Sequence, residues 1–221
     1  MPAVPLAPPP LGLATDDSLE VTRVLPRRLV RISQYPAGEP YFGASGANRF
    51  DAPGCLAGAP EFRSCYFGFS LEVAVAESLL HDEIPVDGAF RFSLAALEQR
   101  YVHHFSGATL RVLDLTGATL KRFSGHADLA GTASYALTQQ WSLAVYRNPL
   151  NFDGFVYMSR HLNTERAVIL FDRAATKVQS KPSPLLLPDT PGLCRVVDPK
   201  TEFSRKGTGV PQTGRTCAAS A

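Results

Sequence analysis

Apolar positions along the chain follow two different periods, which predict a mixture of short strands and helices. Short runs rich in aromatic and β-branched residues predict strands, and these runs are Ser64–Phe69, Phe90–Phe92, Tyr101–Phe105, Leu110–Leu115, Phe155–Met158 and Ala167–Phe171. Apolar residues at helical spacing predict helices over Leu71–His81, Leu94–Gln99 and Thr132–Tyr146. We therefore expect a single α+β domain of mixed sheet with few helices.

The periodic pattern weakens at both ends of the 221-residue chain. Residues 1–22 are rich in proline, so we expect them to be flexible, whereas residues 23–176 hold the periodic segments and form the predicted domain. Residues 177–221 mix proline, glycine, serine and threonine, and only Leu185–Leu187 and Cys194–Val197 are candidates for packing. This C-terminal extension is predicted to be partly irregular.

The composition is consistent with a small soluble enzyme. The chain has 22 basic and 20 acidic residues, a net charge of +2, and no basic run, so direct nucleic-acid binding is not expected. No apolar run approaches a membrane span and the N-terminus lacks the basic start of a signal peptide, which predicts a cytoplasmic protein. The four cysteines, Cys55, Cys65, Cys194 and Cys217, lack metal-ligand spacing, so neither a metal site nor a disulfide framework is expected.

The segment Tyr41–His81 brings three chemically useful side chains into one short stretch. Arg49 lies in a glycine-rich predicted loop, Tyr66 on the following strand, and Glu77 in a helix that Ser70 can cap. A planar arginine fork, an aromatic ring and a carboxylate suit an anionic, aromatic ligand such as a dinucleotide. The segment therefore predicts a ligand pocket.

The predicted helix is apolar almost all round, which is typical of a buried helix. Glu72 lies in its first turn, where an acid complements the helix dipole. At about 100° per residue, Glu77 points roughly 140° away from Glu72, so we expect it to face protein or a cleft. A carboxylate there needs a partner or a function. Two interpretations stay open: a structural ion pair with an arginine such as Arg49 or Arg31, or a functional acid.

These segments resemble the RES domain family, whose members are mostly toxins of bacterial toxin–antitoxin pairs. The resemblance rests on LVRIS at Leu29–Ser33, NRF at Asn48–Phe50, CYFGFS at Cys65–Ser70, SLEVAVAES at Ser70–Ser78 and NFDGFVYMSRHLNTERAVILFD at Asn151–Asp172. One departure is the step of seventeen positions from Arg49 to Tyr66, which is longer than usual. We expect this insertion, at residues 51–62, to affect the pocket mouth or the acceptor site more than the fold.

The resemblance implies a fold related to the ADP-ribosyltransferases and consumption of NAD as a substrate, with no bound cofactor. It implies that Glu77 stabilises an oxocarbenium-like transition state, and that Arg49 holds a pyrophosphate or a phosphate. Tyr66 would pack against nicotinamide or hold the ribose, and Ser159 would donate a hydrogen bond to the nicotinamide ribose or amide. Arg31 is a second-rank site residue that would pair with the pyrophosphate or with Glu77.

The chemistry of the leaving group fits a site with one acid. Nicotinamide leaves as a neutral molecule and needs no general acid, in contrast to the paired carboxylates of ordinary glycosidases. Water, inorganic phosphate or a protein side chain could be the acceptor, which would make the enzyme a glycohydrolase, a phosphorylase or an ADP-ribosyltransferase. No second acid forms an E-x-E pair with Glu77, which favours a small acceptor.

The resemblance also implies a partner, an Xre-like antitoxin that covers the NAD pocket. Two other hypotheses remain at this point. One is a non-catalytic module that uses the Arg49 and Glu77 cleft to bind a nucleotide or a protein. The other is a purely structural ion pair in an unrelated domain.

Overall fold

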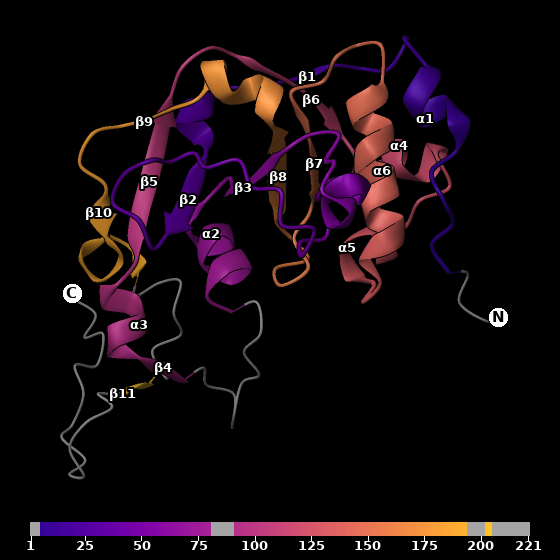
Figure 1. Ribbon diagram of the computed structural model, residues 1–221. Helices are drawn as coiled ribbons and strands as arrows, with labels where there is room; N and C mark the ends of the chain where they lie inside the picture. The colour runs from indigo at the N-terminus through magenta and orange to yellow at the C-terminus, as the bar shows by residue number, and fades with distance from the viewer. Residues whose placement is uncertain (1–4, 81–90, 194–201, 205–221) are drawn as a thin grey trace.

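A mixed β-sheet runs through the computed structural model, which describes residues 5–80, 91–193 and 202–204 (Figure 1). Its strand order is β1-β6-β7-β8-β3-β2-β5-β10, with β9 also paired to β5. The strands are β1 (Thr22–Val24), β2 (Val30–Ser33), β3 (Ser64–Gly68), β5 (Tyr101–Ser106), β6 (Leu110–Asp114), β7 (Gly154–Met158), β8 (Arg166–Phe171), β9 (Gln179–Ser180) and β10 (Leu185–Leu186). Among the described strands of this sheet, β6 and β7 alone pair in parallel. A separate parallel pair joins β4 (Arg91–Ser93) to β11 (Glu202–Ser204).

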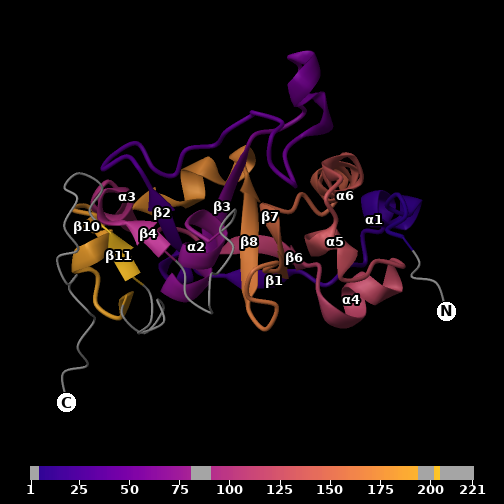
Figure 2. The ribbon, with the colours of Figure 1, turned by 90° about the horizontal axis from the view of Figure 1, so that it is seen from below.

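The helices lie in two groups. They are α1 (Leu11–Thr15), α2 (Leu71–Ser78), α3 (Leu94–Glu98), α4 (Gly117–Arg122), α5 (Asp128–Gly131) and α6 (Tyr135–Arg147), with short 3-10 turns at Pro26–Arg28, Pro53–Ala57, Asp172–Lys177 and Leu187–Asp189. Helices α1, α4, α5 and α6 gather at the β6–β7 end, whereas α2 and α3 lie toward β2 and β5 (Figures 1 and 2). None of the helices in the described ranges is long and apolar enough to cross a membrane.

The predicted α+β class is confirmed, and each predicted strand and helix has a counterpart. Differences fall at the ends, where hydrogen bonding rather than apolar pattern sets the boundary. The helix predicted to reach His81 ends at Ser78, and His81 lies outside the described residues. Short elements such as β1 and α4 were not predicted, because three to six residues carry too little periodicity to be recognised.

A large core cluster packs α6 and the Arg49 segment against the sheet. Phe50 is fully buried, and its ring meets Phe155 and Tyr157 edge-on at centroid distances of 5.0 and 4.8 Å. Burying one phenylalanine contributes about 1.5–3 kcal/mol. The residue that follows Arg49 is therefore anchored in the core.

The N-terminal segment is packed over residues 5–22, where flexibility was predicted. Leu13 is fully buried, and Asn148 Nδ2 donates a hydrogen bond to its carbonyl oxygen at 2.9 Å. Trp141 Nε1 donates to the carbonyl of Ala7 at 2.9 Å. The proline content indicated flexibility, but Leu6, Leu13 and Leu19 are buried in the core cluster that also contains residues of α6.

Part of the C-terminal extension completes the sheet. Strands β9 and β10 both pair with β5, and Leu187 is fully buried. Leu185 and Leu186 are exposed, so the predicted packing of this leucine run holds for one of its three members. The other candidate, Cys194–Val197, lies outside the described residues.

Candidate active site

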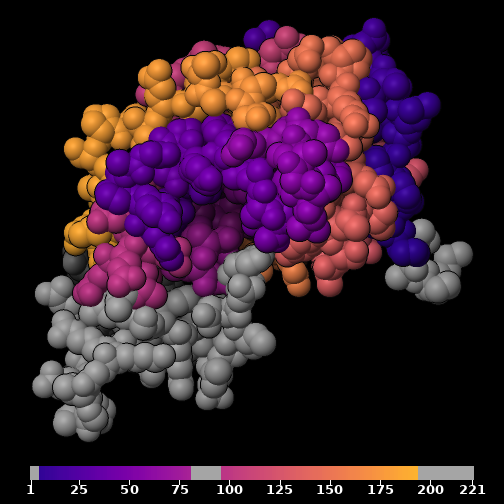
Figure 3. Space-filling view, in the orientation of Figure 1, coloured from indigo at the N-terminus to yellow at the C-terminus, as the bar shows by residue number. Residues whose placement is uncertain are grey.

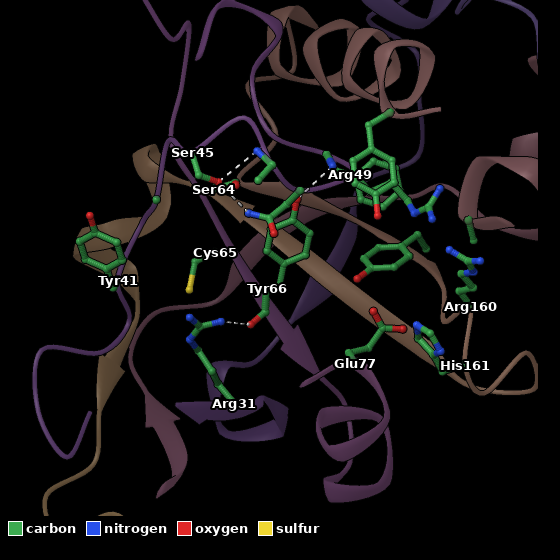
Figure 4. Close-up of a pocket in the computed structure, with 17 residues that line it drawn as sticks. Arg31, Tyr41, Ser45, Arg49, Ser64, Cys65, Tyr66, Glu77, Arg160 and His161 are labelled. Carbon is green, nitrogen blue, oxygen red and sulfur yellow. Dashed lines mark hydrogen bonds between the residues drawn. The ribbon is translucent and has the colours of Figure 1, made fainter. Parts of the chain in front are cut away.

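A pocket of about 380 Å³ opens where β3, α2, the end of β7 and the loop around Arg49 meet. In the space-filling view, the segment that carries this loop overhangs a hollow in the face of the molecule (Figure 3). The pocket is lined by four residues predicted from the sequence, namely Arg31, Arg49, Tyr66 and Glu77. It is also lined by others that were not predicted, among them Tyr135, Tyr157, Arg160 and His161. Arg49 and Glu77 enter the pocket from opposite sides (Figure 4).

Helix α6 holds the segment 45–51, here called the Arg49 loop. Thr138 Oγ1 donates a hydrogen bond to the carbonyl of Arg49 at 2.6 Å, and Ser142 Oγ donates to that of Phe50 at 2.8 Å. Gln139 Nε2 donates to the carbonyls of Gly46 and Asn48 at 3.1 Å. Together these three side chains of α6 satisfy loop carbonyls that burial removes from water. A glycine-rich loop thus has a fixed path.

One nitrogen of the Arg49 guanidinium is hydrogen-bonded within the protein, and another is free to bind a ligand. Its Nη1 donates to the carbonyl of Thr132 at 2.6 Å, and the group lies 4.9 Å from the ring centroid of Tyr135. Nη2 is buried and has no hydrogen-bond partner in the described part of the chain. Burial lowers the pKa of Arg49, and the positive charge of Arg160 lowers it further. A partly desolvated cation beside a second cation favours an anionic ligand.

Tyr66 turns its hydroxyl toward the Arg49 loop. The oxygen accepts a hydrogen bond from the backbone N–H of Phe50 at 3.0 Å and donates to Asp51 Oδ1 at 3.4 Å. Burial raises the pKa of Tyr66 well above its usual range, and the neighbouring Asp51 carboxylate adds to this. The ring faces the pocket, as a stacking role requires, whereas the hydroxyl supports the loop.

Arg31 pairs with Glu39, so the suggested ion pair between Arg31 and Glu77 is wrong. Arg31 Nε lies 2.7 Å from Glu39 Oε2, and Nη1 donates to the carbonyl of Tyr66 at 3.1 Å. Arg31 lies on β2 and reaches across to β3, where it supports the backbone beneath the pocket. Arg31 also lines the pocket.

Glu77 is held by a hydroxyl group. Ser159 Oγ donates to Glu77 Oε1 at 2.5 Å and accepts from the Leu162 N–H at 3.2 Å. Among the described residues, neither Arg49 nor Arg31 forms an ion pair with Glu77, so the structural ion pair that the sequence left open does not form. Glu72 is exposed and Glu77 is half-buried, as the helical spacing predicted.

Ser159 lies behind Glu77. It is only 1% exposed and does not line the pocket, so the hydrogen bond predicted to reach the ligand goes to the carboxylate. Tyr157 lies two residues earlier on β7 and faces the same side. Burial raises the pKa of Tyr157 well above its usual range, and the Glu77 charge raises it further.

Sequence reasoning could have found some of the additional lining residues. Tyr157 precedes Ser159 by two positions on a strand, so period-two alternation puts both on one face. Arg160 and His161 directly follow that serine at the strand end. Tyr135 gave no such signal, because it begins a helix far along the chain and its position depends on how α6 packs against the Arg49 loop.

The insertion at residues 51–62 forms a loop that extends away from the pocket between two points at its base. At its base, Gly43 and Ser64 exchange two backbone hydrogen bonds of 2.9 Å. Ser64 Oγ also donates a hydrogen bond to Asp51 Oδ1 there. The 3-10 turn Pro53–Ala57 lies on an arm that projects from the domain (Figure 2). None of the insertion's residues lines the pocket, so the structure does not support the predicted effect on the pocket mouth.

The chain belongs to the RES domain family, whose model matches residues 25–192. The chain is similar to the probable toxin y4kH of Sinorhizobium fredii (strain NBRC 101917 / NGR234), with 36% identity over 89 residues, which are 40% of this chain and 69% of that protein. It is also similar to a chain in the crystal structure of the M. tuberculosis MbcT-MbcA toxin-antitoxin complex. That likeness has a TM-score of 0.51 and 15% identity, and covers 72% of this chain and 84% of that chain, so it shows the fold alone.

Proposed function

We propose that this protein is a toxin that cleaves the nicotinamide–ribose bond of NAD, depletes NAD and arrests growth. Family membership and the similarity to a probable toxin support the toxin class. The observation that carries the chemistry is the charge pattern of the pocket. Of its described lining residues Glu77 is the one acid, and it shares the pocket with Arg31, Arg49 and Arg160.

The reaction needs what this pocket provides. The bond from ribose C1′ to the nicotinamide nitrogen breaks, and its electron pair stays on nitrogen, so the positively charged ring leaves as neutral nicotinamide. Positive charge develops on the ribose, and a preorganised carboxylate stabilises it. Glu77, oriented by Ser159, supplies that charge without a second acid, in contrast to the two carboxylates of ordinary glycosidases.

The remaining groups match the rest of the dinucleotide. Arg49 keeps a buried donor free and has the Arg160 charge nearby, so this pair suits the two phosphates of NAD. Tyr66 and Tyr157 line the same pocket as Arg49 and Glu77, so they offer aromatic rings on which the nicotinamide or the adenine can stack. NAD is therefore a substrate, and its binding needs no further cofactor.

A small acceptor completes the reaction. Attack by water gives ADP-ribose, nicotinamide and one proton, whereas attack by inorganic phosphate gives ADP-ribose 1″-phosphate and nicotinamide. The absence of a second acid among the described lining residues favours acceptors that need little activation. Phosphate, already an anion at neutral pH, is such an acceptor, and the arginines of the pocket favour it.

An Xre-like antitoxin is the proposed protein partner. The solved relative was crystallised as a toxin-antitoxin complex, which supports this class of partner. An antitoxin that covers the pocket would keep NAD from Glu77 until the antitoxin is removed.

Product identification tests the proposal. Purified protein is incubated with NAD, with and without inorganic phosphate, and the products are identified by mass spectrometry. We expect free nicotinamide in both arms or only with phosphate, and none above background with Arg49→Ala or Glu77→Ala. Unchanged NAD in every arm, with folded protein free of antitoxin, would refute NAD cleavage. ADP-ribose attached to protein would show an ADP-ribosyltransferase.

A further inference from the structure

Asp51 is a buried carboxylate that the proposed chemistry does not use. It is 1% exposed, yet no basic side chain in the described ranges forms an ion pair with it. Hydrogen-bond donors surround it instead. A carboxylate away from water is tolerated only where such donors replace the lost hydration.

Five donors converge on the two oxygens of Asp51. Oδ2 accepts from Ser45 Oγ at 3.0 Å and from the backbone N and Nδ2 of Asn48 at 3.2 and 3.0 Å. Oδ1 accepts from Ser64 Oγ at 2.7 Å and from the Tyr66 hydroxyl at 3.4 Å. One side chain thus ties the start of the Arg49 loop to strand β3.

Arg49 lies between two residues that this network fixes. The N–H of Asn48 donates to Asp51, and the N–H of Phe50 donates to the Tyr66 hydroxyl at 3.0 Å. We propose that Asp51 is a positioning residue, which fixes the backbone on both sides of Arg49 and so directs the guanidinium into the pocket. Its effect on turnover rests on the proposed NAD chemistry, whereas its effect on the Arg49 loop does not.

Loss of the carboxylate should misplace Arg49. Asp51→Ala removes the acceptor of these five hydrogen bonds and frees the loop to shift. A displacement of about 1 Å in a binding group can cost roughly 100-fold in rate. Because Arg49 is assigned to the phosphates, we expect the KM for NAD to rise by about tenfold or more, with a smaller change in kcat. Asp51→Asn keeps the volume and one acceptor oxygen, so its effect should be intermediate.

Asp153 provides a matched control. It is also 1% exposed, and it accepts hydrogen bonds from Lys177 Nζ and the Arg111 N–H, but in the described part of the chain its side chain forms no hydrogen bond with the Arg49 loop. Asp153→Asn should lower stability and leave the KM for NAD within about twofold of wild type. A rise in KM for Asp51→Asn alone would separate positioning of Arg49 from general destabilisation.

Two readouts decide the proposal in the full chain. Steady-state kinetics give KM and kcat for Asp51→Asn and for the control Asp153→Asn. Hydrogen exchange measures protection of residues 45–51, which we expect Asp51→Asn to lower and Asp153→Asn to leave unchanged. If wild type does not cleave NAD, the proposed function fails, and exchange alone decides the positioning. Unchanged KM and unchanged loop protection, or unchanged protection in an inactive protein, would overturn the inference.

Discussion

The hydrogen bond from Ser159 to Glu77 should have a large effect on stability for a single hydroxyl group. Ser159→Ala removes a donor to a carboxylate at 2.5 Å and the acceptor of the Leu162 N–H. A hydrogen bond to a charged group contributes about 1.5–3 kcal/mol, and the orphaned amide costs up to about 1 kcal/mol more. We therefore expect the free energy of unfolding to fall by about 3 kcal/mol. For a chain of this size, that lowers Tm by roughly 6–12 °C.

Urea denaturation can measure this loss through Trp141, the single tryptophan, which is 1% exposed in the core. Ser142→Ala is the matched control, because its hydroxyl is also buried but donates to a neutral carbonyl, and should cost about 1 kcal/mol.

A double-mutant cycle isolates the charge. In a Glu77→Gln background the hydroxyl meets a neutral amide, so Ser159→Ala should cost about 1–2 kcal/mol including the orphaned Leu162 amide, which leaves a coupling of about 1–2 kcal/mol. The reasoning is refuted if Ser159→Ala costs no more than Ser142→Ala and the cycle is additive.

Three further predictions concern the fold around the site. Leu13→Ala should lower the free energy of unfolding by about 3 kcal/mol in urea denaturation, because Leu13 is fully buried, whereas a flexible N-terminus predicts no change. Burial alone would raise the pKa of Glu39, but the charge of Arg31 and hydrogen bonds to the carboxylate lower it below 4.5. Stability should therefore fall as pH drops below 4.5, and Glu39→Gln should weaken this dependence in acid titrations of Tm. Gly68→Ala should cost about 1–3 kcal/mol, because the added Cβ would lie 2.7 Å from the Ala74 nitrogen; a Tm equal to wild type would contradict this.

The sequence predicted the parts of the site that depend on local pattern. A strand, an N-cap and a helix place Tyr66 and Glu77, and the structure has Ser70 Oγ accepting from the Val73 N–H as an N-cap does. Helical spacing alone separated exposed Glu72 from half-buried Glu77.

Partners across the chain could not be predicted in this way. Arg31 pairs with Glu39 because a loop after β2 turns back to it, and Ser159, just after the end of β7, forms a hydrogen bond with Glu77 on α2. Such contacts join residues far apart in sequence or through irregular backbone, and periodicity carries no information about them. The packed N-terminus was missed for the same reason, since the apolar surface that covers Leu13 is formed by other elements.

Nicotinamide release by a matched pair of variants tests the central claim most directly. Glu77→Gln and Glu72→Gln make the same chemical change on one helix, at the pocket and on the exposed face. With NAD and phosphate, we predict that wild type and Glu72→Gln release nicotinamide at rates within about twofold of each other. We predict that Glu77→Gln is slower by about 100-fold or more, as for loss of a preorganised charge-stabilising group. Equal rates for both variants, or no release by wild type, would contradict the account.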